Sequence, residues 1–374
     1  MKIVTVLGTR PEIIRLSRVI EQLDKHCTHI LVHTGQNFDK NLSDIFFDEL
    51  GIRKPDYHLN VRGATFGEQI ANILKETEVV LQKEQPDRLL VLGDTNSSLC
   101  AIIAKRLGIP VCHMEAGNRC YDDRVPEEVN RRIIDHSSDI LLPYTERSRA
   151  NLIREGFFGD RILVTGNPIL EVISHYQDRI DKSRIFKQLK IKKGQYFLVT
   201  IHRAENVDIE SRLRQILSAL SALHQQYSIP VICSLHPRTR DKVRRFNLDL
   251  ETSGILFHDP FGFFDFVHLE QNALCVLSDS GTVQEECCIF HVPNVTVRDV
   301  TERPETIECG SNILSGCDHD SIIRCVNIVL SPSRTWAVPP EYLNPSVSRT
   351  ITKIVCGYNQ NMIPEGQGKN TTRL

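Results

Sequence analysis

The sequence lacks the features that would assign it to several broad classes of protein. No apolar run approaches the ~20 residues that a membrane-spanning helix needs, and the short apolar run at 3–7 has neither the length nor the flanks of a secretory signal. Neither sign of charge dominates, since 45 Lys and Arg stand against 47 Asp and Glu, which gives no support to nucleic-acid or polybasic membrane binding. We therefore expect a cytoplasmic protein that binds neither nucleic acid nor a membrane.

Metal and redox motifs are missing as well. The 12 cysteines form no Cys-x-x-Cys pair, the 14 histidines form no His-Glu-x-x-His pattern, and the turn after the first apolar run is not Gly-x-Gly-x-x-Gly. Scattered cysteines in such a chain are expected to be reduced, small and buried, with zinc ligation as the less favoured alternative. The sequence therefore predicts neither a metal nor a nicotinamide cofactor.

What the chain does contain is an alternation of short apolar runs, polar turns and amphipathic helices. Strands are expected at 3–7, 29–34, 88–92, 111–114, 140–142 and 162–164, and after a charged surface segment at 196–200, 231–233, 275–277 and 295–297. Helices are expected near 11–23, 40–50, 64–84, 95–107 and 145–155, and the apolar stripe that begins at Phe66 is expected in the core. This pattern predicts an α/β protein with two doubly wound parallel-sheet domains that face each other.

The expected domains span 1–167 and 168–341. A length of 374 residues is ample for two separate hydrophobic cores. A last helix is expected at 342–357, with apolar residues at Val347, Ile351, Ile354 and Val355, and a polar, frayed tail at 358–374.

The most informative stretch is 89–131. Asp94 and Glu115 directly follow two successive buried strands, and Glu127 and Glu128 follow Pro126, a favoured first residue of a helix. Because ligands bind at the carboxyl ends of strands in open parallel sheets, these acids should meet at one ligand site. The plainer alternative is that Asp94 caps the helix that follows it, and that Glu127 and Glu128 complement the dipole of the helix after Pro126, for about 0.3–1 kcal/mol each. Glu115 has no capping role, and several carboxylates at one edge favour chemistry.

Two helix N-termini are suited to anions. Gly8 permits a tight turn before the first helix, and Arg10 stands beside it. Residues 280–282, Ser-Gly-Thr, open a later helix that is expected to bind a diphosphate, with a plain helix cap as the alternative. Glu285 or Glu286, one turn further on, could accept a pair of ribose hydroxyls.

Eight motifs, taken in order, carry a resemblance to a known family. They are Gly-Thr-Arg-Pro-Glu at 8–12, Thr-Gly-Gln at 34–36, Gly-Asp-Thr at 93–95, Glu-Ala-Gly at 115–117, Pro-Glu-Glu at 126–128, His-Arg at 202–203, Ser-Asp-Ser-Gly at 278–281 and Thr-Glu-Arg-Pro-Glu at 301–305. Together they resemble the non-hydrolysing UDP-N-acetylglucosamine 2-epimerase family over roughly residues 1–316. The resemblance implies a glycosyltransferase-B-like fold of two Rossmann-type domains with a cleft between them, and a C-terminal helix that returns to the first domain. It also implies a UDP-N-acetyl-amino-sugar substrate, no cofactor and a homodimer.

The same resemblance assigns roles to individual residues. Members of the family eliminate UDP to leave a 2-acetamidoglycal and then add it back with C2 inverted. The catalytic carboxylates implied here are Asp94, Glu115 and Glu127, and His202 would steady or protonate the departing diphosphate. The implied substrate-binding residues are Arg10, Arg15, His236, Phe266 (on the uracil), Ser280, Gly281, Glu286 (on the ribose) and Arg303.

The chain also departs from the commonest form of the family. Arg15 replaces a lysine, Asn37 a histidine and Thr282 a glycine, and the loop from Glu115 to Pro126 is short. Met-Glu-Ala-Gly-Asn-Arg-Cys at 114–120 is more similar to a branch that converts UDP-2-acetamido-2,6-dideoxy-L-talose to UDP-N-acetyl-L-fucosamine for capsule or O-antigen synthesis. The alternatives are an ordinary UDP-GlcNAc 2-epimerase, a UDP-sugar glycosyltransferase and a non-catalytic nucleotide-sugar sensor, which would tolerate loss of the acids.

Overall fold

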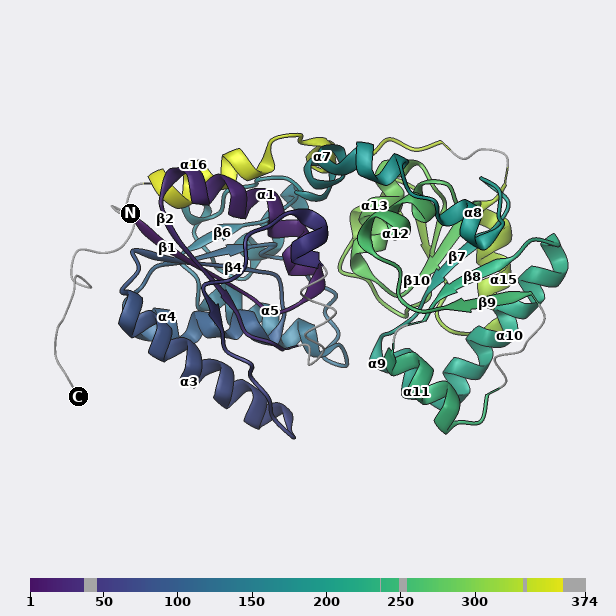
Figure 1. Ribbon diagram of the computed structural model, residues 1–374, viewed down its shortest axis with the longest axis horizontal. Helices are drawn as coiled ribbons and strands as arrows, with labels where there is room; N and C mark the ends of the chain where they lie inside the picture. The colour runs from purple at the N-terminus through teal and green to yellow at the C-terminus, as the bar shows by residue number, and fades with distance from the viewer. Residues whose placement is uncertain (37–45, 236, 249–253, 332–334, 359–374) are drawn as a thin grey trace. The chain divides into compact units, whose positions relative to one another are not determined.

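The computed structural model describes residues 1–36, 46–235, 237–248, 254–331 and 335–358 (Figure 1). The chain divides into two compact units: unit 1 holds Met1–Val172 and the segment from Asn344 onwards, and unit 2 holds Ile173–Leu343. The first boundary falls inside a helix, α7 (Ile169–Asp181). Asn37, His236, the tail from 359 and most of the helix expected at 40–50 lie outside the described residues, although 46–50 are helical.

Unit 1 is built on a parallel sheet with the strand order β3-β2-β1-β4-β5-β6. The strands are β1 (Lys2–Leu7), β2 (Thr28–His33), β3 (Tyr57–His58), β4 (Arg88–Leu92), β5 (Val111–Met114) and β6 (Ile140–Leu142). The order reverses between β1 and β4, and ligands of doubly wound sheets bind at such a reversal. Gly8 follows β1 there, where a Cβ would stand only 2.1 Å from Ser97 Oγ and 2.2 Å from Thr34 Oγ1.

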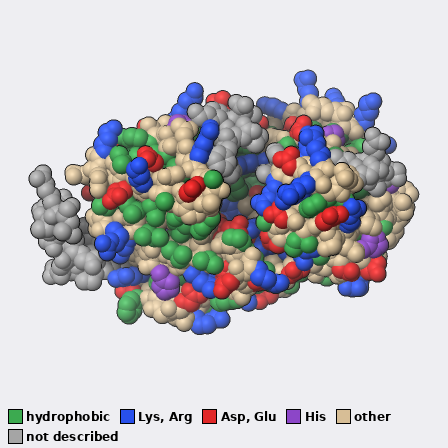
Figure 2. Space-filling model, turned by 90° about the horizontal axis from the view of Figure 1, so that it is seen from below, with side chains coloured by type: hydrophobic (Ala, Val, Ile, Leu, Met, Phe, Trp, Pro, Cys, Tyr) green, Lys and Arg blue, Asp and Glu red, His purple; other side chains and the backbone are tan. Residues whose placement is uncertain are grey.

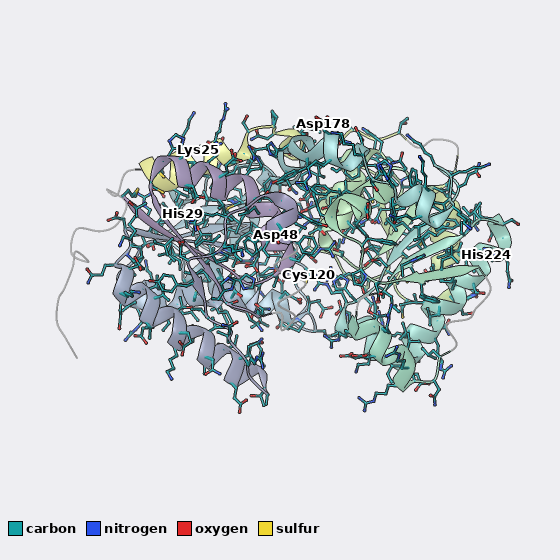
Figure 3. All side chains as sticks on the ribbon, in the orientation of Figure 1. Lys25, His29, Asp48, Cys120, Asp178 and His224 are labelled. Atoms are coloured by element: carbon teal, nitrogen blue, oxygen red, sulfur yellow. The ribbon has the colours of Figure 1, made fainter. Side chains whose placement is uncertain are left out.

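Helices cover both faces of this sheet, with α1 (Arg10–His26) and α16 (Val347–Gly357) on one face and α3 (Phe66–Glu84) and α4 (Ala101–Arg106) on the other (Figure 1). The remaining elements are the 3-10 turns η1 (Asn96–Cys100) and η2 (Gly159–Arg161) and the helices α5 (Pro126–His136) and α6 (Glu146–Arg154). His29 of β2 lies between this sheet and α1, with Nε2 2.8 Å from Thr5 Oγ1 and Nδ1 2.6 Å from Asp24 Oδ1 (Figure 3).

The last helix, α16, packs on α1, so unit 1 is completed by residues from the C-terminal part of the sequence (Figure 1). Arg88, buried at the start of β4, donates to the carbonyl oxygens of Ile354 at 3.0 Å and Val355 at 2.8 Å, and also to that of Tyr358. The helix expected at 342–357 begins only at Val347, after a 3-10 turn, η3 (Pro340–Leu343). Pro345 explains the break, because proline disfavours the helical conformation of the residue before it.

Three further expectations for unit 1 were wrong. Residues 162–164 form one isolated bridge to β6 rather than a strand, because Pro143 has no N–H to continue the ladder. The helix expected at 95–107 begins as the 3-10 turn η1. Phe66 is 61% exposed rather than in the core, whereas Ile73 and Leu81 of the same stripe are buried.

Unit 2 contains a second six-stranded parallel sheet, with the order β12-β11-β10-β7-β8-β9. Its strands are β7 (Phe197–Thr200), β8 (Val231–Ser234), β9 (Ile255–His258), β10 (Cys275–Ser278), β11 (Asn294–Thr296) and β12 (Asn312–Leu314). Alternate residues of β7 point to opposite faces. Phe197 and Val199 join the core under α10 (Glu210–Tyr227) and α15 (His319–Val329), and Leu198 joins the core under α12 (Phe263–Gln271) and α13 (Gly281–Phe290).

The shorter helices of unit 2 are α8 (Ile185–Leu189), α9 (Ala204–Val207), α11 (Pro237–Arg245) and α14 (Pro304–Glu308). The predicted class, α/β with two doubly wound parallel sheets, is confirmed. Within the described part of the chain, no helix has the length and apolar character needed to cross a bilayer.

Candidate functional site

Asp94 and Glu115 follow the last residues of β4 and β5, as predicted. Glu115 has a backbone φ of +66°, a left-handed conformation that costs a non-glycine residue roughly 1–2 kcal/mol. Its N–H donates to the carbonyl oxygen of Leu142 at 3.1 Å, and its Oε2 lies 3.9 Å from where a Cβ on Gly93 would stand. The strained backbone thus places the Glu115 carboxylate beside the turn that carries Asp94, and strain of this kind is concentrated at functional sites.

The Glu115 carboxylate is nearly buried, and polar side chains hold both of its oxygens. Arg15 Nη1 lies 3.3 Å from Oε2, and Asn118 Nδ2 donates to Oε1 at 3.3 Å. Ser148 in turn donates to the Asn118 side-chain oxygen at 2.7 Å, and the Arg15 guanidinium lies over the ring of Tyr144, 5.5 Å from its centroid. Arg15, which was predicted to bind substrate, is therefore buried beside a predicted catalytic acid.

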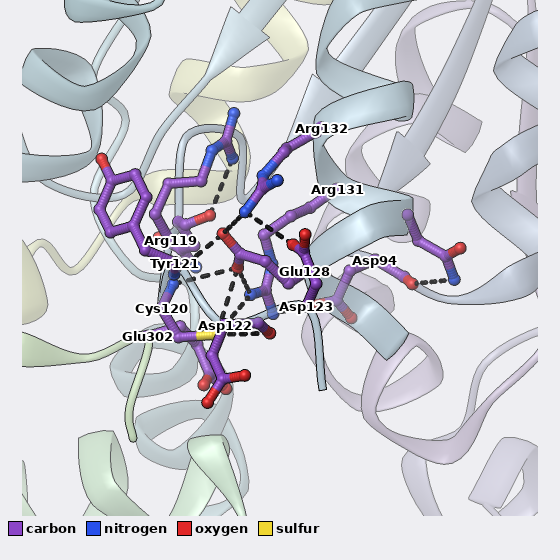
Figure 4. A network of polar contacts seen from close by, with 12 residues as sticks. Asp94, Arg119, Cys120, Tyr121, Asp122, Asp123, Glu128, Arg131, Arg132 and Glu302 are labelled. Atoms are coloured by element: carbon purple, nitrogen blue, oxygen red, sulfur yellow. Dashed lines mark hydrogen bonds and ion pairs between the residues drawn. The ribbon is translucent and has the colours of Figure 1, made fainter. Parts of the chain in front are cut away.

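An ion pair and a hydrogen bond join the turn after β4 to the first half of α5 (Figure 4). The guanidinium of Arg131 forms ion pairs with both Asp94 and Glu128, and Asn130 Nδ2 donates to the Asp94 carbonyl oxygen at 3.0 Å. Glu127 lies in the first turn of the same helix and is partly exposed. The structure therefore brings Asp94, Glu115 and Glu127 to the carboxyl edge of one sheet. Arg131 was missed, although its position one turn after Glu127 was visible in the sequence.

Glu128 has a structural role that its neighbour Glu127 does not share. Its buried carboxylate accepts the backbone N–H groups of Cys120 at 3.0 Å and Tyr121 at 3.1 Å (Figure 4). Burial opposes its charge, but the Cys120 N–H and Arg131 outweigh burial and hold the pKa of Glu128 below its ordinary value. Of the two adjacent glutamates, Glu128 is therefore the one whose carboxylate holds the backbone of the loop at Cys120 and Tyr121.

A fully buried polar network supports the same turn from behind. His113 Nε2 lies 2.8 Å from the Gly93 carbonyl oxygen, and its Nδ1 lies 2.8 Å from Asp135 Oδ1. Arg119 pairs with Asp135 at 2.8 Å and with Glu155 at 2.6 Å. Burial opposes the charge of Asp135, but His113 and Arg119 hold its pKa below the ordinary value. Both ring nitrogens of His113 therefore lie within hydrogen-bond distance of an oxygen acceptor. The sequence analysis did not single out this network, whose one visible signal was a histidine within an apolar strand.

The anion expected at the start of α1 comes from the protein itself. The Glu12 carboxylate accepts the N–H groups of Gly8 at 3.0 Å and Thr9 at 2.8 Å, an arrangement known as a capping box. Burial raises the pKa of Glu12 to about 7 against the opposing effect of these hydrogen bonds. Arg10 lies over the ring of Phe46, 4.6 Å from its centroid.

In unit 2, Asp279 organises the turn that contains His202. Its fully buried carboxylate accepts the N–H groups of His202 at 3.0 Å and Arg203 at 2.9 Å and the side-chain amide of Asn206 at 3.1 Å. His202 Nδ1 lies 3.1 Å from Asp279 Oδ1, so the carboxylate also sets the orientation of the ring. Burial opposes this charge, but His202 and the backbone donors keep the pKa of Asp279 below its ordinary value.

The first turn of α13 lies against buried ion pairs. Ser280 is the N-cap residue, and at Gly281 a Cβ would stand 2.7 Å from Glu302 Oε1, which explains the glycine. Arg303, predicted to bind substrate, is buried and forms an ion pair with Glu285. Of the two glutamates considered for the ribose, Glu285 is therefore already paired.

Glu286 is 7% exposed and lies beside the fully buried Glu270. Burial and the neighbouring Glu286 raise the pKa of Glu270 well above its ordinary value. Phe266 is 9% exposed and packs in the core, and His236 lies outside the described residues. Within the described ranges, no group of three or more His, Cys, Asp or Glu is arranged to hold a metal ion.

Comparison with known proteins supports the assignment that the motifs suggested. The chain is 43% identical to a UDP-N-acetylglucosamine 2-epimerase of Methanocaldococcus jannaschii, covering 91% of this chain and 95% of the relative. It is 42% identical to a UDP-2,3-diacetamido-2,3-dideoxy-D-glucuronate 2-epimerase of Pseudomonas aeruginosa, over 87% and 91% of the two chains.

A solved structure agrees with these relatives. The crystal structure of the M. jannaschii UDP-GlcNAc 2-epimerase in complex with UDP-GlcNAc and UDP superposes with a TM-score of 0.90, at 41% identity, over 95% of this chain and 99% of that one. The family described as UDP-N-acetylglucosamine 2-epimerase matches residues 21–356. The chain is therefore an isomerase with two Rossmann-type units, and it belongs to the UDP-N-acetylglucosamine 2-epimerase family.

Proposed function

We propose that this UDP-sugar 2-epimerase acts on a 6-deoxy sugar, converting UDP-2-acetamido-2,6-dideoxy-L-talose to UDP-N-acetyl-L-fucosamine for capsule or O-antigen synthesis. The observation that carries the chemistry is the gathering of Asp94, Glu115 and Glu127 at one edge of the first sheet. UDP-GlcNAc is the alternative substrate, because the names of most similar relatives specify it.

The chemical difficulty is that the C2 hydrogen of a UDP-sugar is not acidic, since no carbonyl group lies next to it. In the proposed route the C1–oxygen bond breaks and its electron pair leaves with UDP. One carboxylate then takes the C2 proton, and C1 and C2 become joined by a double bond. In the reverse step the UDP oxygen attacks C1 while a second acid delivers a proton to the opposite face of C2. Asp94, Glu115 and Glu127 are the proposed proton carriers, which requires positioned groups with suitable pKa values.

Unit 2 is proposed to bind UDP. The oriented His202 ring would steady or protonate the departing diphosphate, and the helix start at Ser280-Gly281 would bind it through backbone N–H groups. Glu286 is proposed to accept the ribose hydroxyls. Arg10, Arg15, His236, Phe266 and Arg303 remain proposed substrate ligands.

The route predicts exchange of the C2 hydrogen with solvent. During epimerisation in deuterated water, the product is expected to carry deuterium at C2, measured by NMR and mass spectrometry, because the proton leaves the sugar for a carboxylate that exchanges with water. The reaction should proceed without added NAD and in the presence of a metal chelator. Complete epimerisation with retained protium at C2 would exclude this route.

The sugar is proposed to be recognised by the loop at 118–125. Glu128 holds the backbone of Tyr121, whose φ is +55°, and the Tyr121 hydroxyl donates to Asn151 Oδ1 at 3.1 Å. The Tyr121 side chain remains 57% exposed, next to the half-buried Cys120 (Figure 4). These two side chains offer a weakly polar wall, which suits a sugar that lacks the C6 hydroxyl.

A side-by-side measurement of kcat/KM tests this assignment. The 6-deoxy-L-talosamine nucleotide is expected to be used at least ~10-fold more efficiently than UDP-GlcNAc, since apolar shape alone discriminates by about 10–200-fold. Tyr121→Ser should reduce the ratio, whereas Phe158→Ser, at a residue 72% exposed outside the loop, should not. A preference for UDP-GlcNAc would assign the enzyme to the ordinary branch and leave the mechanism unchanged.

We also propose that the enzyme is a homodimer, as the resemblance implies. Apolar side chains are exposed on the face of unit 1 that carries α3 (Figure 2), among them Phe66 at 61% and Val79 at 57%. Exposed apolar surface of this kind supports self-association.

A further inference from the structure

Two cysteines of unit 2 lie side by side without being bonded. Cys288, in the last turn of α13, is buried, and Cys309, the C-cap residue of α14, is half-buried. Their Sγ atoms are 3.6 Å apart. A disulfide would require the sulfurs to approach to about 2.05 Å, which is about 1.5 Å closer.

The two thiols differ in burial and in the direction of their pKa shifts, and Cys309 is the less buried of the two. Cys309 Sγ donates to the Ser311 hydroxyl oxygen at 3.4 Å, and this hydroxyl donates to the Thr306 carbonyl oxygen at 3.0 Å. The Cys288 thiol and Ser311 hold the pKa of Cys309 below its ordinary value, against the effect of partial burial. The contact with Cys309, together with burial, raises the pKa of Cys288. Burial likewise raises the pKa of the half-buried Cys317.

We propose that Cys309 and Cys288 form an oxidisable dithiol, in which the Cys309 thiolate attacks a peroxide and Cys288 resolves the product to a disulfide. The geometry supplies what such a pair requires, namely a sulfur that is only half-buried, at Cys309, and a second sulfur within van der Waals contact of it.

The proposed oxidation conserves atoms and electrons in both of its steps. The Cys309 thiolate attacks hydrogen peroxide, the O–O bond breaks, and Cys309 becomes a sulfenic acid as hydroxide leaves. Cys288 sulfur then attacks Cys309 sulfur, the S–O bond breaks, and the thiol proton and the departing hydroxide form water. The two sulfurs together lose two electrons, which the peroxide gains, and a reducing thiol reverses the bond by exchange.

The disulfide would join two helices that begin at proposed UDP ligands. α13 starts after Ser280, and α14 starts after Arg303. Closing the sulfurs is expected to shift these helix ends and weaken UDP binding. This consequence rests on the proposed function, whereas formation of the bond does not.

The protein also contains a reporter for the reaction. Trp336 is the one tryptophan of the sequence. Its indole N–H donates to the Cys288 carbonyl oxygen at 3.0 Å, and its ring stacks on His291 with centroids 5.4 Å apart. Bond formation at Cys288 should therefore change the tryptophan fluorescence.

The test treats the intact enzyme with hydrogen peroxide at neutral pH and maps the products by non-reducing peptide mass spectrometry. We expect a Cys288–Cys309 disulfide that a reducing thiol removes, with a matching fluorescence change. Cys309 should react at least ~10-fold faster than Cys317, because the gain in thiolate at Cys309 exceeds its loss of nucleophilicity. Cys317→Ser serves as the matched control and should leave the bond unaffected.

Cys309→Ser should abolish the bond and the fluorescence change. Cys288→Ser and Cys288→Ala should instead trap the sulfenic acid at Cys309, detected with a dimedone reagent, with folding checked by circular dichroism. Equal rates at Cys309 and Cys317, or disulfides that join other cysteines at the same rate, would overturn the proposal. A Cys288–Cys309 bond that forms without changing UDP affinity would leave the dithiol standing and count against the proposed UDP ligands.

Discussion

Asp94→Asn, Glu115→Gln and Glu127→Gln are each expected to lower kcat by at least ~100-fold, the usual scale for a positioned acid or base. An amide keeps the shape of the carboxyl group but cannot carry the transferred proton. The sites of Asp94 and Glu127 should tolerate the change, since Arg131 keeps Glu128 as a partner when Asp94 is neutral, and Glu127 is partly exposed. Glu115 pairs with the buried Arg15, so the folding of Glu115→Gln is checked by circular dichroism. Steady-state assays with the UDP-sugar measure the loss.

Binding of UDP separates a chemical role from a structural one. Calorimetric affinities for UDP should change far less than kcat, because the nucleotide is proposed to bind to unit 2. Glu146→Gln is the matched control, since this glutamate lies on α6 with its side chain 64% exposed. Equal losses in turnover and UDP affinity would mean that the three acids are structural.

Asp135→Asn is expected to destabilise unit 1 by about 3–5 kcal/mol, the usual result of removing one partner from a buried charge cluster. Asp135 is fully buried and contacts His113 and Arg119, and a neutral amide would remove the carboxylate charge from beside the buried Arg119. Because its pKa in the folded state lies below the ordinary value, its stabilisation is present above the unfolded pKa and is lost as the pH falls through the folded one. The urea dependence of amide exchange in β4 and β5 measures the change.

The control for this variant is an ion pair of the same unit at its surface. Glu21 is 40% exposed and pairs with Arg18 and Lys25 along α1. Glu21→Gln should cost less than about 1 kcal/mol, because exposed pairs contribute little. A similarly small loss for Asp135→Asn would show that the buried network adds no net stability.

The sequence predicts the central strands of the two sheets better than the strands at their edges. Strands such as β4 and β10 are continuous apolar runs that end in polar turns, and they were found where expected. β9 and β12 were missed because they are short strands at the sheet edges, where Leu256 of β9 is 41% exposed and an apolar pattern is weak.

In the candidate site, the positions of the acids could be predicted from the sequence, but their partners could not. Asp94 and Glu115 could be predicted because their strands end immediately before them, and the motif Thr-x-x-Glu at 9–12 contained the signal for the Glu12 cap. The partners of these acids could not be predicted, because Arg131 meets Asp94, and His113 meets Gly93, only through packing of α5 and β5 on the turn after β4. The left-handed backbone of Glu115 likewise depends on tertiary contacts that outweigh its local cost.

The packing of α16 has a consequence for how the chain is synthesised. Unit 2 is continuous in sequence, whereas unit 1 needs residues from both sides of it. A ribosome adds about 5–20 residues per second, so roughly ten seconds or more separate the appearance of Arg88 from that of its acceptors at Ile354 and Val355. During this interval the carbonyl oxygens of α16 that accept hydrogen bonds from the Arg88 guanidinium have not yet been synthesised. Unit 1 therefore cannot complete its fold until α16 has been synthesised, whereas unit 2 can complete its fold before then.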